Sequence, residues 1–117
     1  MATGIIPKTA SFIKLWTNPS PTSSFAPQTI SIDLTNYDAV LIEAHNFRYD
    51  NSQYALSAVI CLKGQTSFFL FGSASNNRLG VRTFSVSDSG VVASEATYNA
   101  TAQNEFGVPH EIYGIRW

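Results

Sequence analysis

The two histidines of the chain, His45 and His110, are the side chains best suited to proton transfer near neutral pH. Glu43 and His45 stand two positions apart, so in a strand they would share one face and could touch. We interpret them as a polar pair on an exposed strand, because such pairs are common and need no catalytic role. The chain has no nucleophile elbow, P-loop or dinucleotide fingerprint. The sequence therefore predicts that this protein is not an enzyme.

Metal binding has little support in the residue pattern. A metal site needs converging His, Cys or carboxylate ligands, and no spacing in the chain resembles one. Asp33, Asp38 and Asp50 are too scattered for a calcium-binding loop. The single cysteine, Cys61, stands in an apolar run, which predicts a small buried side chain. We expect no metal and no cofactor.

The segment FRYDNSQY, residues 47–54, is a better candidate for binding. Aromatic rings stack on sugar rings while amides and carboxylates bond to hydroxyl groups, so this mixture of side chains suits a glycan site. An ordinary polar loop is the alternative interpretation. The segment SASNNR, residues 73–78, is a second candidate of the same kind. The predicted ligand-binding residues are Phe47, Arg48, Tyr49, Asp50, Asn51, Gln53, Asn76, Asn77 and Arg78.

The run from Phe68 to Phe71, FFLF, is apolar on both faces of a predicted strand. A strand in a monomeric sandwich usually needs only one apolar face, so the second face of this strand needs a cover. A loop of the same chain or a neighbouring subunit could supply that cover, and burial in the core is the simpler alternative. The predicted subunit-interface residues are Phe68, Phe69 and Phe71.

Composition restricts the classes of partner. The chain has 117 residues, enough for one core, and we expect a linker at residues 1–10 and a single domain at residues 11–117. Charged residues make up 13% of the chain, and a net charge of −1 without a basic cluster argues against binding to nucleic acid. No apolar run reaches the ~18 residues that a membrane span needs. We therefore expect neither a nucleic-acid partner nor membrane insertion.

Alternation of apolar and polar residues with a period of two runs through most of the chain and predicts strands. Gly64-Gln65 and Asp88-Ser89-Gly90 are typical of hairpin turns. The predicted strands cover residues 11–16, 29–34, 39–47, 54–63, 66–71, 79–87, 91–98 and 108–117. The sequence thus predicts an all-β fold, an antiparallel β-sandwich of about eight strands that resembles a jelly roll.

A long uncharged connector, residues 17–27, separates the first two predicted strands. Pro19, Pro21 and Pro27 stiffen it and cannot donate hydrogen bonds to a sheet. We expect this connector to cross from one sheet of the sandwich to the other.

Two stretches resemble a known domain. Residues 15–43, LWTNPSPTSSFAPQTISIDLTNYDAVLIE, resemble the opening of a domain found in tail and fibre proteins of tailed phages, especially phages of Gram-positive hosts. Residues 108–117, VPHEIYGIRW, are similar to its ending, where a Pro-x-x-Ile-Tyr-Gly-Ile pattern closes the chain. Together they cover about a third of the chain. The resemblance implies a small β-sandwich at the C-terminal end of a fibre or spike, generally a trimer, without assigned catalytic residues.

The function expected from these observations is that of a virion fibre or spike tip domain, which trimerises and attaches the particle to host cell-surface glycan. Its expected partners are two further copies of itself, a host polysaccharide and other virion proteins, and its expected location is the surface of the virion. The alternatives are a purely structural assembly domain of a head fibre or tail knob, and a carbohydrate-binding module.

Overall fold

The computed structural model describes residues 11–46, 55–73 and 78–117, with the backbone alone at residues 72, 73 and 78. These residues form ten β-strands and no helix. None of them therefore belongs to a helix that is long and apolar enough to cross a membrane. The strands are β1 (Ser11–Thr17), β2 (Gln28–Ser31), β3 (Ala39–His45), β4 (Leu56–Leu62), β5 (Thr66–Ser73), β6 (Arg78–Ser87), β7 (Gly90–Ala93), β8 (Thr97–Tyr98), β9 (Thr101–Ala102) and β10 (Pro109–Arg116).

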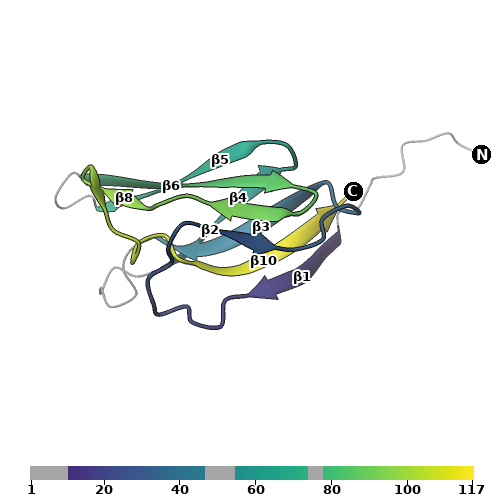
Figure 1. The fold of residues 1–117 in the computed structure, drawn as a ribbon, viewed down its shortest axis with the longest axis horizontal. Helices are drawn as coiled ribbons and strands as arrows, with labels where there is room; N and C mark the ends of the chain where they lie inside the picture. The colour runs from purple at the N-terminus through teal and green to yellow at the C-terminus, as the bar shows by residue number, and fades with distance from the viewer. Residues whose placement is uncertain (1–10, 47–54, 74–77) are drawn as a thin grey trace, which may run out of the picture.

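The strands form two antiparallel sheets that pack face to face (Figure 1). One sheet has the order β1-β10-β3-β4. In the other, β5 pairs with one edge of β6, while β7 and β8 pair with successive parts of its opposite edge. Strands that are far apart in the sequence pair with each other, β1 with β10 and β2 with β7. The predicted antiparallel sandwich is confirmed, with ten strands in place of about eight.

The proline-containing connector crosses from the sheet of β1 to the sheet of β2, as predicted. Asn18 fixes its start, because the backbone N–H donates to the carbonyl oxygen of His110 at 2.8 Å and the side-chain Nδ2 to that of Pro109 at 2.9 Å. Further along, the N–H of Phe25 donates to the carbonyl oxygen of Asn104 at 2.8 Å. Hydrogen bonds therefore tie both ends of the connector to residues 104–110, which lead into β10.

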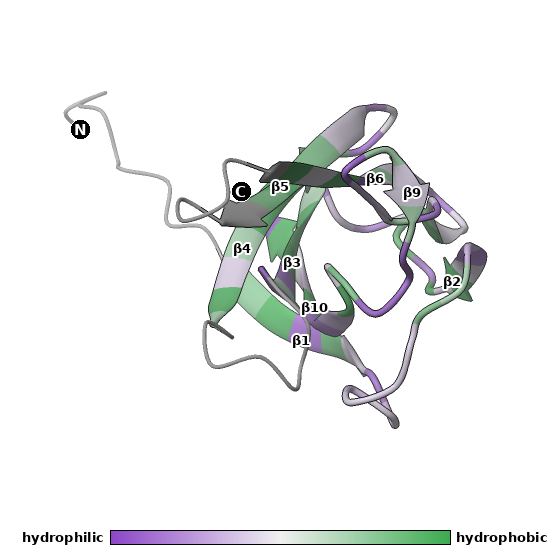
Figure 2. Ribbon diagram, turned by 90° about the vertical axis from the view of Figure 1, so that its left-hand side faces the viewer, coloured by the Kyte–Doolittle hydropathy of each residue, from purple (hydrophilic) through white to green (hydrophobic). Residues whose placement is uncertain are grey.

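The turn at residues 63–65 forms a corner where the two sheets meet (Figure 2). The turn is tight, since the N–H of Gln65 donates to the carbonyl oxygen of Leu62 at 3.1 Å. However, the flanking strands do not make the expected hairpin, because β4 pairs with β3 and β5 pairs with β6. This corrects the hairpin prediction: β4 is an edge of one sheet and β5 is an edge of the other.

One strand predicted at residues 91–98 is divided into β7 and β8. Ser94 lies at the break, where its side-chain oxygen accepts a hydrogen bond from the N–H of Thr83 at 2.8 Å. A serine hydroxyl can replace a backbone acceptor in this way and interrupt a regular ladder. The chain then turns back in the short pair β8–β9 through Asn99 and Ala100, which both have positive φ.

Aromatic rings fill the core between the sheets. Phe71, Tyr98 and Phe106 form a cluster of nearly parallel rings, with centroids 5.5 Å apart for Phe71 and Phe106, 4.6 Å for Tyr98 and Phe106, and 6.3 Å for Phe71 and Tyr98. Gly80 lies against this cluster, where a Cβ atom would overlap the ring of Phe71. Cys61 is fully buried in the same core, as the sequence predicts.

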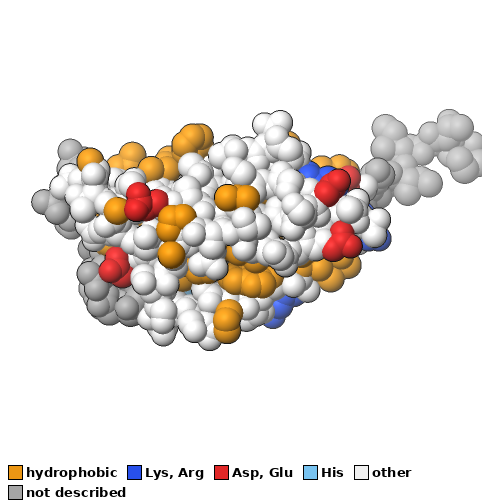
Figure 3. Space-filling view, in the orientation of Figure 1, with side chains coloured by type: hydrophobic (Ala, Val, Ile, Leu, Met, Phe, Trp, Pro, Cys, Tyr) orange, Lys and Arg blue, Asp and Glu red, His pale blue; other side chains and the backbone are white. Residues whose placement is uncertain are grey.

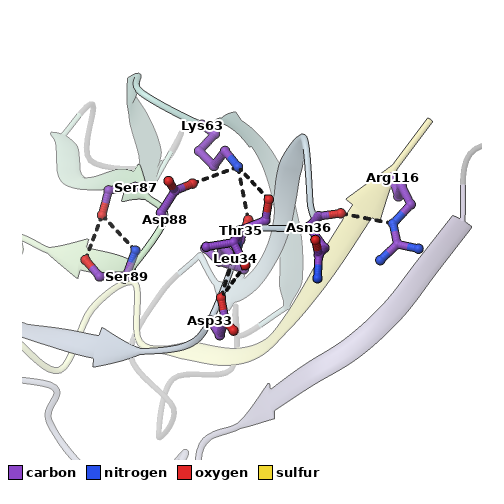
Figure 4. A network of polar contacts seen from close by, with 9 residues as sticks. All are labelled: Asp33, Leu34, Thr35, Asn36, Lys63, Ser87, Asp88, Ser89 and Arg116. Atoms are coloured by element: carbon purple, nitrogen blue, oxygen red, sulfur yellow. Dashed lines mark hydrogen bonds and ion pairs between the residues drawn. The ribbon is translucent and has the colours of Figure 1, made fainter.

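A lysine joins three turns at the end of the sandwich (Figure 4). The Nζ atom of Lys63, in the turn between β4 and β5, lies 2.8 Å from Oδ1 of Asp88 in the turn between β6 and β7. The same Nζ donates to the carbonyl oxygen of Leu34 at 3.1 Å, in the loop between β2 and β3. These contacts hold the corner turn against the rest of the domain.

Candidate functional site

The two histidines, which are far apart in the sequence, lie side by side in the structure. Their rings meet edge to face with centroids 5.1 Å apart. His45 is fully buried, which corrects the expectation that it belongs to an exposed polar pair. The ladder between β3 and β10 brings them together, and His110 lies at the register shift between Pro109 and Glu111. Only the pairing of these two strands, which sequence spacing does not give, reveals this contact.

Acidic groups surround the exposed side of this pair. Glu43 on β3 lies opposite Glu111 on β10. Burial lowers the pKa of the His110 imidazole, while the carboxylates of Glu111 and Glu43 act in the opposite direction. The pKa of His110 therefore lies below its usual value, and the fold favours the neutral ring.

Tyr113 and Lys14 complete this polar row. The hydroxyl group of Tyr113 donates a short hydrogen bond to the carboxylate of Glu111, and Lys14 Nζ lies 3.5 Å from the other oxygen of the same carboxylate. The bond from Tyr113 lowers the pKa of Glu111 and raises the pKa of Tyr113 to about 12. A tyrosine with a raised pKa and a carboxylate with a lowered pKa are poor proton-transfer groups at neutral pH. The row is best explained as a polar surface ladder.

The described residues give this polar row no substrate site. They enclose no pocket. Within the same residues, no three His, Cys, Asp or Glu side chains come close enough together to hold a metal ion. An active site normally combines a concave pocket with converging titratable groups. Among the described residues, the polar row therefore lies on the surface with no pocket beside it.

Most residues of the predicted glycan site lie outside the described residues. Only their flanks are seen: the N–H of Asn46 donates to the carbonyl oxygen of Ala55 at 2.9 Å, and the N–H of Ala55 donates to Oδ1 of Asn46 at 3.1 Å. Arg78 begins β6, and its side chain is not described. The residues outside the described ranges are Phe47, Arg48, Tyr49, Asp50, Asn51, Gln53, Asn76 and Asn77.

The structure separates the residues predicted for a subunit interface. Phe69 and Phe71 point into the core of their own chain, and Phe69 is only 3% exposed. Phe68 points outward and is 64% exposed, as does Leu70 two positions further on. Among the three predicted residues, Phe68 alone offers its side chain to a partner. Leu70 was missed, although alternation along the strand places it beside Phe68.

The outward face of β4 is also apolar. Leu56, Ile60 and Leu62 are about half exposed, whereas Cys61 on the opposite face is buried. Alternation alone would place the larger aliphatic face inward, because burial of leucine and isoleucine contributes the most free energy. The strand instead turns its larger apolar side chains to solvent, and this arrangement is unusual for an isolated domain.

These two faces lie on either side of the corner between the sheets, and we call their exposed apolar residues together the apolar corner. Orange side chains gather along the upper rim of the molecule, where Figure 1 places β5 (Figure 3). The apolar corner consists of Leu56, Ile60 and Leu62 on β4, Phe68 and Leu70 on β5, and Leu79 on β6. Summed over both faces, their exposed fractions correspond to roughly 600 Å² of apolar surface.

The chain matches no protein-family model, no curated protein and no solved structure.

Proposed function

We propose that this chain is an oligomerising β-sandwich domain of a virion fibre or spike. Three copies associate through the apolar corner, and the assembled tip attaches the particle to host cell-surface glycan. The apolar corner is the observation that carries the proposal. Exposed apolar surface of this size marks an interaction site in soluble proteins, because covering it removes it from water.

The size of the corner is appropriate for association between subunits. A stable interface buries about 800 Å² on each partner, and roughly two thirds of an obligate interface is apolar. The leucine, isoleucine and phenylalanine side chains of the corner expose roughly 600 Å² in total, and a ring in which each copy has two neighbours divides this surface between two interfaces. The ammonium group of Lys63, which follows Leu62 of the corner, is paired with Asp88 at 2.8 Å, so association need not bury this charge unpaired.

The virion context is supported by the resemblance of two stretches to a phage fibre domain, and these stretches pack against each other. β1 pairs with β10 along its length. Gly114, from the ending, packs against Leu15 and Tyr37, which belong to the opening. The guanidinium of Arg116 lies 5.2 Å from the ring centroid of Tyr37. Residues from both stretches thus depend on each other within one structural unit.

A purely structural assembly domain is the second candidate. It is favoured by one observation, namely that the described residues enclose no pocket for a ligand. Attachment to glycan is supported by the low charge of the chain and by the aromatic and amide composition of residues 47–54. Both candidates use the same oligomer, and they differ in whether that oligomer binds sugar.

Light scattering over a concentration series tests the proposal, with Ile60→Asp as the disrupting variant. Val92→Asp is the matched control, because Val92 is 48% exposed on β7, outside the apolar corner. We expect a trimer for the unmodified chain and for Val92→Asp, and a monomer for Ile60→Asp. An unmodified chain that stays monomeric at every concentration would refute the proposal. Glycan-array binding by the oligomer favours attachment, and its absence favours the structural role.

A further inference from the structure

We propose that the two sides of the apolar corner bind each other in adjacent copies. The β4 side of one copy, formed by Leu56, Ile60 and Leu62, packs on the β5–β6 side of the next copy, formed by Phe68, Leu70 and Leu79. The interface is therefore heterologous, and it closes into a ring around an axis parallel to the strands. This inference rests on the proposed self-association and specifies which surfaces meet.

The first argument is the direction of the two sides. β4 is the edge of one sheet and β5 is the edge of the other, so their outward faces diverge around the corner (Figure 2). A two-fold dimer uses the same patch on both subunits. A single two-fold contact on one side would leave the other side in water. A closed ring covers both sides of every copy, because each copy has two neighbours.

The second argument is that residues of β4 and β5 match in their distance from the turn, which we call their level along the strands. Counted outward from the turn at residues 63–65, Ile60 and Phe68 lie at the same distance from the turn, as do Ala58 and Leu70. Rotation about an axis parallel to the strands keeps each residue at its level. The small side chain of Ala58 would then face the large side chain of Leu70 in the next copy, and such alternation of size favours close packing.

The third argument is the mirrored apolar content of the two sides. In register, Leu70 lies opposite Val81, and Leu79 follows on the same outward face of β6. On the other sheet, Ile60 lies opposite Leu41. The apolar surface of each side therefore extends from the edge strand onto the next strand of the same sheet, from β4 to β3 and from β5 to β6. Each side is wide enough to receive the edge strand of a neighbour.

Mixing two single variants tests this pairing. Ile60→Asp disables the β4 side and Leu70→Asp disables the β5–β6 side. We expect each variant alone to be monomeric in light scattering. An equimolar mixture should form a 1:1 dimer and nothing larger, because one intact side remains on each partner. A mixture that stays monomeric would overturn the heterologous pairing, and so would a variant that still forms the full oligomer alone.

Cysteine cross-linking provides a second test that avoids charged substitutions. The double variant Ala58→Cys/Leu70→Cys should form covalent trimers on oxidation, while each single cysteine variant should not cross-link. Cys61 is buried and does not interfere. Cross-links between identical positions in a single variant would indicate a two-fold contact and overturn the inference. If the unmodified chain is monomeric, the proposed function fails as well; if it is oligomeric without these cross-links, only the pairing fails.

Discussion

Arg82 donates a hydrogen bond of 2.8 Å from Nη1 to the backbone carbonyl oxygen of Ser94. Its Nη2 atom donates to the carbonyl oxygens of Asn104 and Phe106, at 3.3 and 3.1 Å. The side chain is fully buried, and this desolvation lowers its pKa to about 10. One buried cation thus holds the start and the end of the segment that leads from β7 to β10.

Arg82→Met should lower the free energy of unfolding by about 3 kcal/mol, because the backbone carbonyl groups stay buried and lose their donor. Replacement of a buried ion pair by apolar residues can be neutral, but here the acceptors cannot be replaced. Urea denaturation measures the difference. Arg116→Met is the control, since the exposed Arg116 side chain makes one 2.9 Å bond from Nε to the carbonyl oxygen of Asn36 and lies over the ring of Tyr37, and it should cost about 1 kcal/mol. Equal losses for both variants would contradict this account of Arg82.

Gly114→Ala should destabilise the domain by about 2 kcal/mol through overpacking. A Cβ atom at this position would lie 2.6 Å from Cδ1 of Tyr37 and 2.7 Å from Cδ1 of Leu15. Chemical denaturation of a double-mutant cycle with Tyr37→Ala isolates the contact. The alanine at position 114 should cost clearly less once the ring is removed. An unchanged cost would show that the ring is not the obstacle.

The alternation of the sequence predicts most strands correctly but not which face of a strand is buried. On β4 the choice is made by pairing with β3, where Cys61 lies opposite Val40 on the core side. A pattern within one strand contains no information about that partner, so the exposure of Ile60 could not be predicted. The same limit applies to the corner at residues 63–65, whose sequence is typical of a hairpin although its strands pair elsewhere.

The candidate site was predictable only in part, because the pattern within one strand does not show which other strands lie beside it. The doubly apolar run from Phe68 to Phe71 indicates a covered second face, and its outward half belongs to the apolar corner. The contribution of β4 depends on the path of the chain around the corner. Arg82 is a further example: a single arginine among alternating residues is expected at the surface, and only the folded segment around it supplies three carbonyl acceptors.

His110→Gln should reduce the amount by which the free energy of unfolding falls when the pH is lowered from 7 to 5. Burial holds the pKa of His110 below its usual 6.5, so the unfolded chain takes up a proton as the pH falls and the folded chain resists it. The free energy of unfolding therefore decreases as the pH falls through this range, and glutamine removes this contribution. Asp33 and Glu111 have pKa values lowered from the usual 3.8 and 4.5. These carboxylates therefore take up protons below the range from pH 7 to 5. Urea denaturation at several pH values measures the slope, and identical slopes for both proteins would count against this role for His110.

Phe68→Ala and Phe69→Ala should lower the free energy of unfolding by very different amounts, although the two residues are neighbours. Phe69 is buried against Phe71 and Phe84, with ring centroids 6.2 and 6.4 Å away, so its truncation should cost about 4 kcal/mol. Phe68 is exposed on the apolar corner, so its truncation should change the stability of a single subunit by less than about 0.5 kcal/mol. Both values are best measured by denaturation in an Ile60→Asp background, in which association is removed.

In the otherwise unmodified chain, Phe68→Ala should impair assembly more than Phe69→Ala does, which is the reverse of their order for stability. Phe68→Ala removes a large side chain from the apolar corner, so it should shift the light-scattering mass toward the monomer at a given concentration. Phe69→Ala leaves that surface in place, and any protein that remains folded should assemble as before. If Phe68→Ala leaves the mass unchanged while Ile60→Asp reduces it, then the interface uses β4 without β5, and the exposure of Phe68 has another cause.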